Sequence, residues 1–113
     1  LNKRNITMLL EKPVFKMYVK NGCPYCDKAR DLILNDLRAS LHLINVSDQT
    51  DLRKLIIKET GQKTVPVVYV GDNFVGGCDD LFRLNETGEL QLLALKAENE
   101  ILIKEVMRLR GNE

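Results

Sequence analysis

The chain of 113 residues is long enough for one domain with its own hydrophobic core. Hydrophobic residues form 44% of the sequence and charged residues 29%, which argues against the composition of a disordered protein. Seventeen basic and sixteen acidic side chains leave a formal charge of +1, so we expect no nucleic acid and no membrane surface as partner. No apolar run approaches the roughly 20 residues that span a bilayer.

Three cysteines indicate the redox environment. Cys23 and Cys26 form a C-x-x-C pair and Cys78 stands alone, whereas secreted disulfide frameworks usually have an even number. Structural zinc takes four ligands, so a zinc site would need all three cysteines and His42, and we expect no metal. A redox-active dithiol in a reducing compartment explains the three cysteines better, and we expect the protein to be located in the cytoplasm. For Cys78 we expect a small, half-buried side chain rather than a regulatory thiol.

Hydrophobic periodicity and turn residues divide the chain into strands and helices. Pro24 suits the first position of a helix because its missing N–H would have no partner there. Leu52, Leu55 and Ile56 form the predicted apolar stripe of the second helix, with Arg53 on the opposite side. A helical crossover followed by a hairpin predicts an α/β fold with a four-stranded mixed sheet flanked by helices. The expected elements are a strand over 14–19, a helix from Cys23 to about Ala39, a strand over 41–46, a helix from Ser47 or Asp48 to Gly61, strands over 66–70 and 74–75, and helices over 78–85 and 89–110.

The cysteine pair opens the first predicted helix. The thiolate is the form that attacks disulfides, and the unpaired N–H groups and the dipole at a helix start stabilise it. Lys20 adds a positive charge three residues upstream. Cys26 follows one helical turn later on the same face and further into the helix. We therefore expect Cys23 to attack a disulfide and Cys26 to resolve the mixed disulfide that results.

Three separated segments together resemble a dithiol glutaredoxin of the C-P-Y-C type. They are Cys23-Pro24-Tyr25-Cys26, Thr64-Val65-Pro66 and Gly76-Gly77-Cys78-Asp79-Asp80. The resemblance covers about residues 13–95 and implies a glutaredoxin domain over 13–96 with the thioredoxin fold. It also implies that glutathione is the co-substrate, and that the chain reduces protein disulfides and protein–glutathione mixed disulfides.

The resemblance also implies a role for individual residues. Cys23 matches the family's nucleophile and Cys26 its resolving thiol. Val65 precedes a cis-proline and would pair its backbone with the cysteinyl part of glutathione. The N–H groups of Cys78 and Asp79 would bind the γ-glutamyl carboxylate at a helix start, and the Asp79 carboxylate would face the adjacent ammonium group. The implied glutathione-binding residues are Lys20 and Arg53 for the glycine carboxylate, together with Tyr25, Thr64, Val65, Pro66, Gly77, Cys78 and Asp79, and Gln62 is a weaker candidate.

Three alternative functions are left open by the sequence. A thioredoxin-like electron donor, for instance to ribonucleotide reductase, would use the same dithiol with a flavoprotein reductase. An iron–sulfur carrier would ligate a cluster through Cys23 and glutathione across a dimer, which Pro24 and the second cysteine disfavour. An interaction module with a vestigial redox site would dock a partner through the last helix. For the main interpretation, the expected partners are disulfide-containing or glutathionylated proteins.

The last predicted helix continues into a C-terminal extension over residues 97–113, and residues 1–12 form an N-terminal extension. Asn99 resembles the polar residue that sets register in parallel coiled-coil dimers. The pattern is shorter than three heptads, so we expect the helix to fold back on its own domain, for instance against Met8–Leu10. We accordingly expect a monomer, with dimerisation as the alternative. The a and d positions of the heptad are Leu92, Leu95, Asn99, Leu102, Val106 and Leu109.

Overall fold

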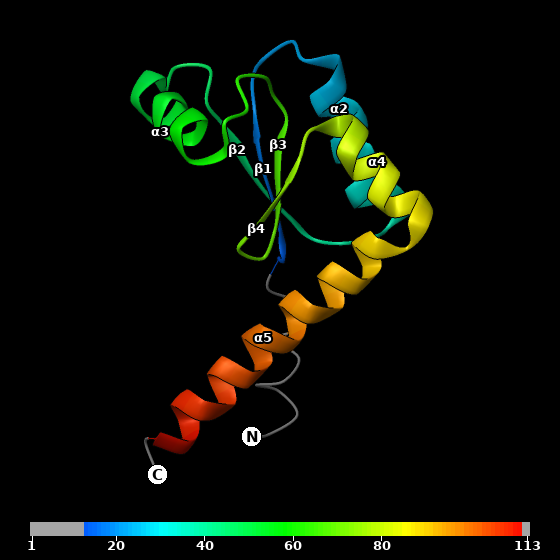
Figure 1. The fold of residues 1–113 in the computed structure, drawn as a ribbon, viewed down its shortest axis with the longest axis vertical. Helices are drawn as coiled ribbons and strands as arrows, with labels where there is room; N and C mark the ends of the chain where they lie inside the picture. Colours follow the sequence, from blue (N-terminus) through cyan, green and yellow to red (C-terminus); the bar gives the residue numbers. More distant parts are fainter. Residues whose placement is uncertain (1–12, 112–113) are drawn as a thin grey trace.

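The computed structural model describes residues 13–111, which form one sheet with helices on both faces (Figure 1). No helix in this range is long and apolar enough to cross a membrane. Its elements, in chain order, are β1 (Phe15–Val19), α2 (Pro24–Asp31), the π-helical turn η1 (Leu32–Asp36), β2 (Leu41–Asn45), α3 (Thr50–Thr60), β3 (Val67–Val70), β4 (Asn73–Gly76), α4 (Cys78–Thr87) and α5 (Glu89–Gly111).

The sheet has four strands in the order β2-β1-β3-β4. β1 pairs in parallel with β2 and antiparallel with β3, and β4 pairs antiparallel with β3. The parallel pair requires the long helical crossover through α2, whereas a tight turn joins β3 to β4. The mixed four-stranded sheet that the sequence predicts is therefore confirmed.

Apolar side chains form one cluster on each face of the sheet. On the face covered by α2 and α4, Met17, Ile33 and Leu81 are completely buried (Figure 1). On the other face, Ile56 of α3 packs with Val67. Both clusters use β3, which is buried along its whole length and so holds the loop before it in place. Truncating Leu81 to alanine would cost about 2–5 kcal/mol of stability, which is typical of a buried leucine.

The first helix is shorter than the sequence predicts. It is α-helical to Asp31, continues as η1, and ends before Arg38 rather than at Ala39. Arg38 has a φ of 52°, in the left-handed region, and it stops the helix without the glycine or proline that would mark a stop in the sequence. The predicted apolar face is nevertheless correct, since its members are buried or half-buried. They are Ala29, Leu32, Ile33 and Leu37.

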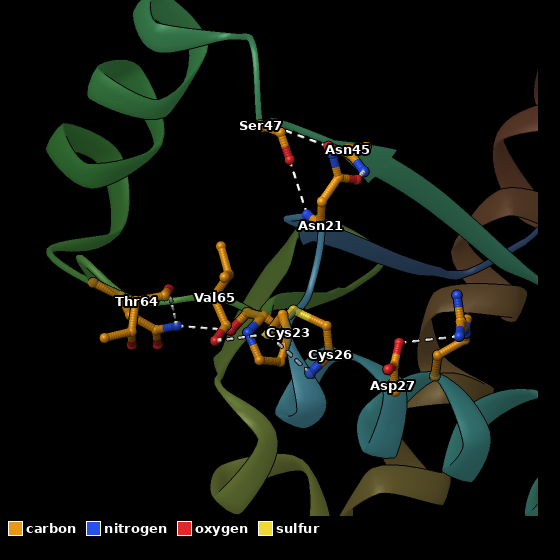
Figure 2. The surroundings of a disulfide bond; sticks show 11 residues. Asn21, Cys23, Cys26, Asp27, Asn45, Ser47, Thr64 and Val65 are labelled. Carbon is orange, nitrogen blue, oxygen red and sulfur yellow. Dashed lines mark hydrogen bonds and ion pairs between the residues drawn. A yellow bond between two sulfur atoms is a disulfide. The ribbon is translucent and has the colours of Figure 1, made fainter.

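The second helix starts at Thr50, not at Ser47 or Asp48 as expected. Ser47 serves the preceding loop instead. Its hydroxyl accepts a hydrogen bond from the Asn21 N–H at 2.9 Å, and its own N–H donates to the Asn45 side chain at 2.9 Å (Figure 2). The predicted cap residue thus ties the loop after β1 to the end of β2, and the helix begins later.

The buried side of α3 also differs from the prediction. Ile56 is buried, but Leu55 is 59% exposed and Ile57 is half-buried in its place. Arg53 lines the same small pocket as Ile56 and Ile57, so it lies beside the apolar side of the helix and not opposite it. This shift turns Arg53 toward the loop before β3, whose residues line the same pocket.

Helix α5 extends from Glu89 to Gly111 without a break. Gly88, which has a φ of 83°, separates it from α4. Leu90 and Ala97 are buried against the domain, and the C-terminal part of the helix projects beyond it (Figure 1). The expected end of the domain, one residue before Ala97, falls within this uninterrupted helix. Met8–Leu10, the expected contact of the extension, lie outside the described residues.

Candidate active site

Two cysteines open helix α2, and their sulfur atoms are joined in a disulfide (Figure 2). Cys23 is the N-cap residue, and Pro24 occupies the first helical turn. The Cys26 N–H donates a hydrogen bond to Cys23 Sγ at 3.2 Å. This N–H belongs to the first turn, where donors have no partner within the helix, and it points to the sulfur that becomes charged on reduction. The helix start therefore stabilises a Cys23 thiolate.

The two cysteines differ in exposure. Cys26 is buried in the core beneath α2, whereas Cys23 is half-buried. Tyr25, between them in sequence, is 62% exposed. An incoming disulfide can therefore reach Cys23 first, and Cys26 can react only with what Cys23 already holds. This arrangement fits the roles that the sequence predicts for the two thiols.

The loop before β3 lies against the disulfide. The Val65–Pro66 peptide bond is cis, and the Val65 carbonyl oxygen is 3.9 Å from Cys23 Sγ (Figure 2). The Gln62 side-chain amide donates hydrogen bonds to the Thr64 carbonyl at 2.9 Å and to the Pro66 carbonyl at 2.8 Å. Gln62 thereby holds the backbone on both sides of Val65. From the sequence, Gln62 is only a weaker candidate for binding glutathione, and nothing in the sequence indicates that it holds the loop around Val65 in place.

The start of α4 meets the same loop. A Cβ atom on Gly77 would lie 3.5 Å from the Gln62 side-chain nitrogen. The Asp80 carboxylate accepts a hydrogen bond from the Gly77 N–H at 3.1 Å and so caps the helix. Within residues 13–111, the N–H groups of Cys78 and Asp79 have no hydrogen-bond partner. Adjacent unpaired N–H groups at a helix start are suited to bind a carboxylate.

Two cations approach the site from other elements. Arg53, on α3, lines the small pocket together with Thr64 and Val65. Lys20 is half-buried directly after β1, in the loop that leads to Cys23. Among the described residues neither cation forms an ion pair. Both are therefore available to an anionic group of a substrate.

Asn21 orders the loop in front of Cys23, a role that the sequence patterns do not predict. Its side-chain oxygen accepts a hydrogen bond from the Asn45 side chain at 2.7 Å, in addition to the bond from its N–H to Ser47 (Figure 2). A signal was present in the sequence. Short polar residues stand at the ends of two strands joined by a predicted helical crossover, and the carboxyl ends of strands joined in this way meet at one edge of a sheet.

Cys78 is unpaired and lies in the core at the start of α4, more deeply buried than expected. Burial raises the pKa of its thiol, and the charge of nearby Lys28 opposes this rise. The thiol is therefore protonated at neutral pH and is a poor nucleophile. Among the described residues, no group of three or more His, Cys, Asp or Glu side chains is placed to hold a metal ion.

Comparison with protein families settles the relationship of the chain. Residues 15–75, more than half of it, match the family model described as Glutaredoxin. The chain belongs to the glutaredoxin family. Glutaredoxins are glutathione-dependent oxidoreductases, and the Cys23–Cys26 pair is the redox-active dithiol of this one. It is accordingly a thiol–disulfide oxidoreductase, as the sequence predicts.

Relatives and solved structures agree with this assignment. The glutaredoxin chain is 35% identical over 78 residues to glutaredoxin 3 of Escherichia coli K12, a match that covers 69% of this chain and 93% of the relative. It resembles the crystal structure of wheat glutaredoxin with a TM-score of 0.70 at 31% identity, over 84% of this chain and 93% of the other. It resembles a buckwheat glutaredoxin–glutathione complex with a TM-score of 0.69 at 25% identity, over 86% and 96%. The thioredoxin-like fold is thereby confirmed.

Proposed function

We propose that this glutaredoxin uses glutathione to reduce protein–glutathione mixed disulfides and protein disulfides. One observation carries the proposal: Cys23 Sγ lies at a helix start, 3.2 Å from the Cys26 N–H and 3.9 Å from the Val65 carbonyl. A disulfide that reaches Cys23 therefore meets both a stabilised thiolate and a stretch of backbone beside it. The solved complex of buckwheat glutaredoxin with glutathione supports glutathione as the ligand.

The cis-proline loop is the proposed site for the middle of glutathione. Val65 would pair its backbone with the cysteinyl residue, which brings the glutathione sulfur toward Cys23. Thr64 and Pro66 complete this loop, and Gln62 fixes their carbonyl groups. Tyr25, largely exposed next to Cys23, would line the groove on the other side.

The two charged ends of glutathione would lie on either side of this loop. The unpaired N–H groups of Cys78 and Asp79 are proposed to bind the γ-glutamyl carboxylate, with the exposed Asp79 carboxylate near the ammonium group. Gly77 has no side chain to cover these N–H groups. Lys20 and Arg53 are proposed to hold the glycine carboxylate, because each is a cation without an ion pair in the described structure.

Cys23 alone would suffice to reduce a protein–glutathione mixed disulfide. Its thiolate attacks the glutathione sulfur, a Cys23–glutathione bond forms, the bond to the protein sulfur breaks, and the protein thiolate takes a proton from water. A second glutathione thiolate then attacks the sulfur of the glutathione bound to Cys23, which yields oxidised glutathione and returns the Cys23 thiolate. The Cys26 N–H favours Cys23 both as nucleophile and as leaving group, because it faces the same sulfur in both steps.

Protein disulfides would need Cys26 as well. After Cys23 attacks such a substrate, the Cys26 thiolate attacks Cys23 Sγ, releases the reduced substrate and forms the disulfide seen here. The Cα atoms of the two cysteines are 5.2 Å apart, which lies within the range that a disulfide spans. Two molecules of glutathione then reduce this disulfide and leave as oxidised glutathione.

Turnover of a glutathione mixed disulfide, recycled by glutathione reductase and NADPH, tests the proposal. Cys23→Ser should abolish turnover, whereas Cys26→Ser should keep it and lose only the reduction of protein disulfides. A folded Cys26→Ser protein without activity on a glutathionylated protein would contradict the assigned roles. A wild-type protein that accepts electrons from thioredoxin reductase but not from glutathione would be a thioredoxin-like donor instead.

We further propose disulfide-containing and glutathionylated proteins as the partners, ribonucleotide reductase among them, and the cytoplasm as the compartment. The unpaired Cys78 supports a reducing environment, because free thiols are kept reduced there. Reduction of purified ribonucleotide reductase by the wild-type protein, with Cys26→Ser as the control that cannot resolve the mixed disulfide, tests that partner. Localisation of the tagged protein by microscopy tests the compartment.

A further inference from the structure

Helix α5 carries apolar side chains on two opposite sides. Among the described residues, the domain covers one side, whereas several side chains on the other side, the open side, are exposed and Leu102, Val106 and Leu109 are half-buried. On the open side Leu92, Leu95 and Ile103 are 62%, 61% and 52% exposed. With about 3.6 residues per turn, Leu92 and Ile103 lie on the side of α5 remote from the domain. Leu95 lies at the edge of that side, where it also lines a groove with Phe15 of the domain. The side chains that pack on the domain core are Leu90, Leu93, Ala94, Ala97 and Ile101.

The open side follows the heptad pattern of a coiled coil. If Leu92 is an a position, the domain-facing residues all fall at b, c and f. Those positions point away from the partner in a two-stranded coiled coil. A second helix on the a and d positions would therefore not displace the domain from α5. The a and d residues are Leu92, Leu95, Asn99, Leu102, Val106 and Leu109.

The short heptad pattern alone predicts a monomer, but from the exposed side of α5 we propose that this helix forms a parallel two-stranded coiled coil with the α5 of a second copy of this chain. Asn99 favours this orientation. In a parallel pair in register it faces the partner's Asn99, and the two amides can form a hydrogen bond. In an antiparallel pair it would face the partner's Leu102 and be buried without a hydrogen-bond partner, which is unfavourable.

Charges at the e and g positions, which flank the contacts between a and d residues, also favour the parallel arrangement. In a parallel pair, Glu105 at a g position lies next to the partner's Arg110 at an e position, once on each side of the dimer. An antiparallel pair would instead bring Glu98 next to the partner's Glu105, and like charges repel. Glu105 also contacts Arg108 of its own helix, so the partner's arginine would extend this pair into a network.

The coiled coil would leave both redox sites open. Helix α5 leaves the domain at the end remote from the N-terminus of α2, where Cys23 lies (Figure 1). Two domains joined through α5 therefore keep Cys23 away from the seam. Turnover per chain should be the same in the dimer and in a dissociated variant. The test of the dimer is therefore independent of the test of the proposed function.

Sedimentation equilibrium of the full chain tests the dimer, under reducing and iron-free conditions that exclude a disulfide or a bridging cluster. The wild type should show a concentration-dependent mass that rises to that of two chains. Leu102→Glu, at a d position, should sediment as a monomer. The matched control is Met107→Glu, which places the same charge on a side chain that is 64% exposed but lies at a b position, and it should remain a dimer.

The edge charges test the orientation. Glu105→Lys should raise the dissociation constant several-fold in a parallel dimer, and adding Arg110→Glu should restore it. In an antiparallel dimer Glu105→Lys would lower the dissociation constant instead, because it would face the partner's Glu98. The proposal is overturned by that result, by a wild type that is monomeric at every concentration, or by a dimer that tolerates Leu102→Glu.

Discussion

Replacing Gly76 with alanine should disrupt the start of α4. Gly76 has a φ of 119°, a conformation that residues with a side chain rarely adopt. A Cβ atom there would come within 2.6 Å of Asp80 Cγ and still closer to Asp80 Oδ2. The Asp80 carboxylate would have to leave its place, where it accepts the Gly77 N–H at 3.1 Å and the Arg83 guanidinium at 2.8 Å.

The expected loss is about 3 kcal/mol of the free energy of unfolding. Backbone strain at a positive φ contributes roughly 1–3 kcal/mol. Losing the cap on the Gly77 N–H contributes about 0.5–2 kcal/mol. The exposed pair between Asp80 and Arg83 adds little, because water screens it. Since the cap also sets the direction of the first turn, Gly76→Ala should raise the KM for glutathione as well.

Urea unfolding of the reduced protein measures the loss, with Gly77→Ala as the matched control. Gly77 has a φ of −100°, and a Cβ atom there would meet its nearest neighbours at 3.5 Å or more, which is ordinary contact. Alanine should therefore change the stability at this position by less than about 1 kcal/mol. If Gly76→Ala proves as stable as Gly77→Ala, then Asp80 does not hold the start of α4, and the reasoning is wrong.

Four further predictions concern residues around the disulfide. Gln62→Ala removes two hydrogen bonds to the cis-proline loop, so it should cost about 1–3 kcal/mol in urea unfolding and raise the KM for glutathione in steady-state kinetics. Arg53→Ala should raise that KM most at low salt, because salt screens an exposed charge pair, and equal effects at low and high salt would count against an ionic contact. In the native reduced protein, iodoacetamide should label Cys23 and spare Cys78. Burial raises the pKa of Cys78, so the protonated thiol should contribute its full stabilisation below the ordinary thiol pKa of about 8.5. This contribution should be lost as the pH rises through the pKa of Cys78 in the folded protein, and urea unfolding of the reduced protein at increasing pH measures the loss.

The parts of the fold that sequence patterns predicted are those that local chemistry determines. The alternation of strand-forming residues at 14–19 and the glycines beside the later strands place the sheet correctly. Pro24 marks the helix start at Cys23, because proline is suited to the first turn. Each of these signals lies within a few residues of the feature it marks. The redox pair and its helix were therefore accessible from the sequence.

The errors arise where a local pattern competes with a distant contact. Ser47 has the side chain of a helix cap, but it bonds to Asn21, which lies 26 residues away. Arg38 ends its helix in the left-handed conformation, which an arginine in the sequence does not predict. The sequence pattern places Arg53 on the wrong side of α3, because it predicts Leu55 to be in the core, whereas Leu55 is exposed in the structure. No pattern along the chain reports which neighbours a folded sheet provides.

The position of Cys26 next to Cys23 would limit the lifetime of every mixed disulfide that this protein forms with a substrate. A substrate bound to Cys23 always has a second thiol within reach, so the complex carries the means of its own dissociation. Attack by Cys26 would both complete the reduction of the substrate and free Cys23 from it, so the mixed disulfide would not persist. Without Cys26 that limit disappears, and in the absence of glutathione the partners of the protein should accumulate on Cys23, where mass spectrometry would identify them.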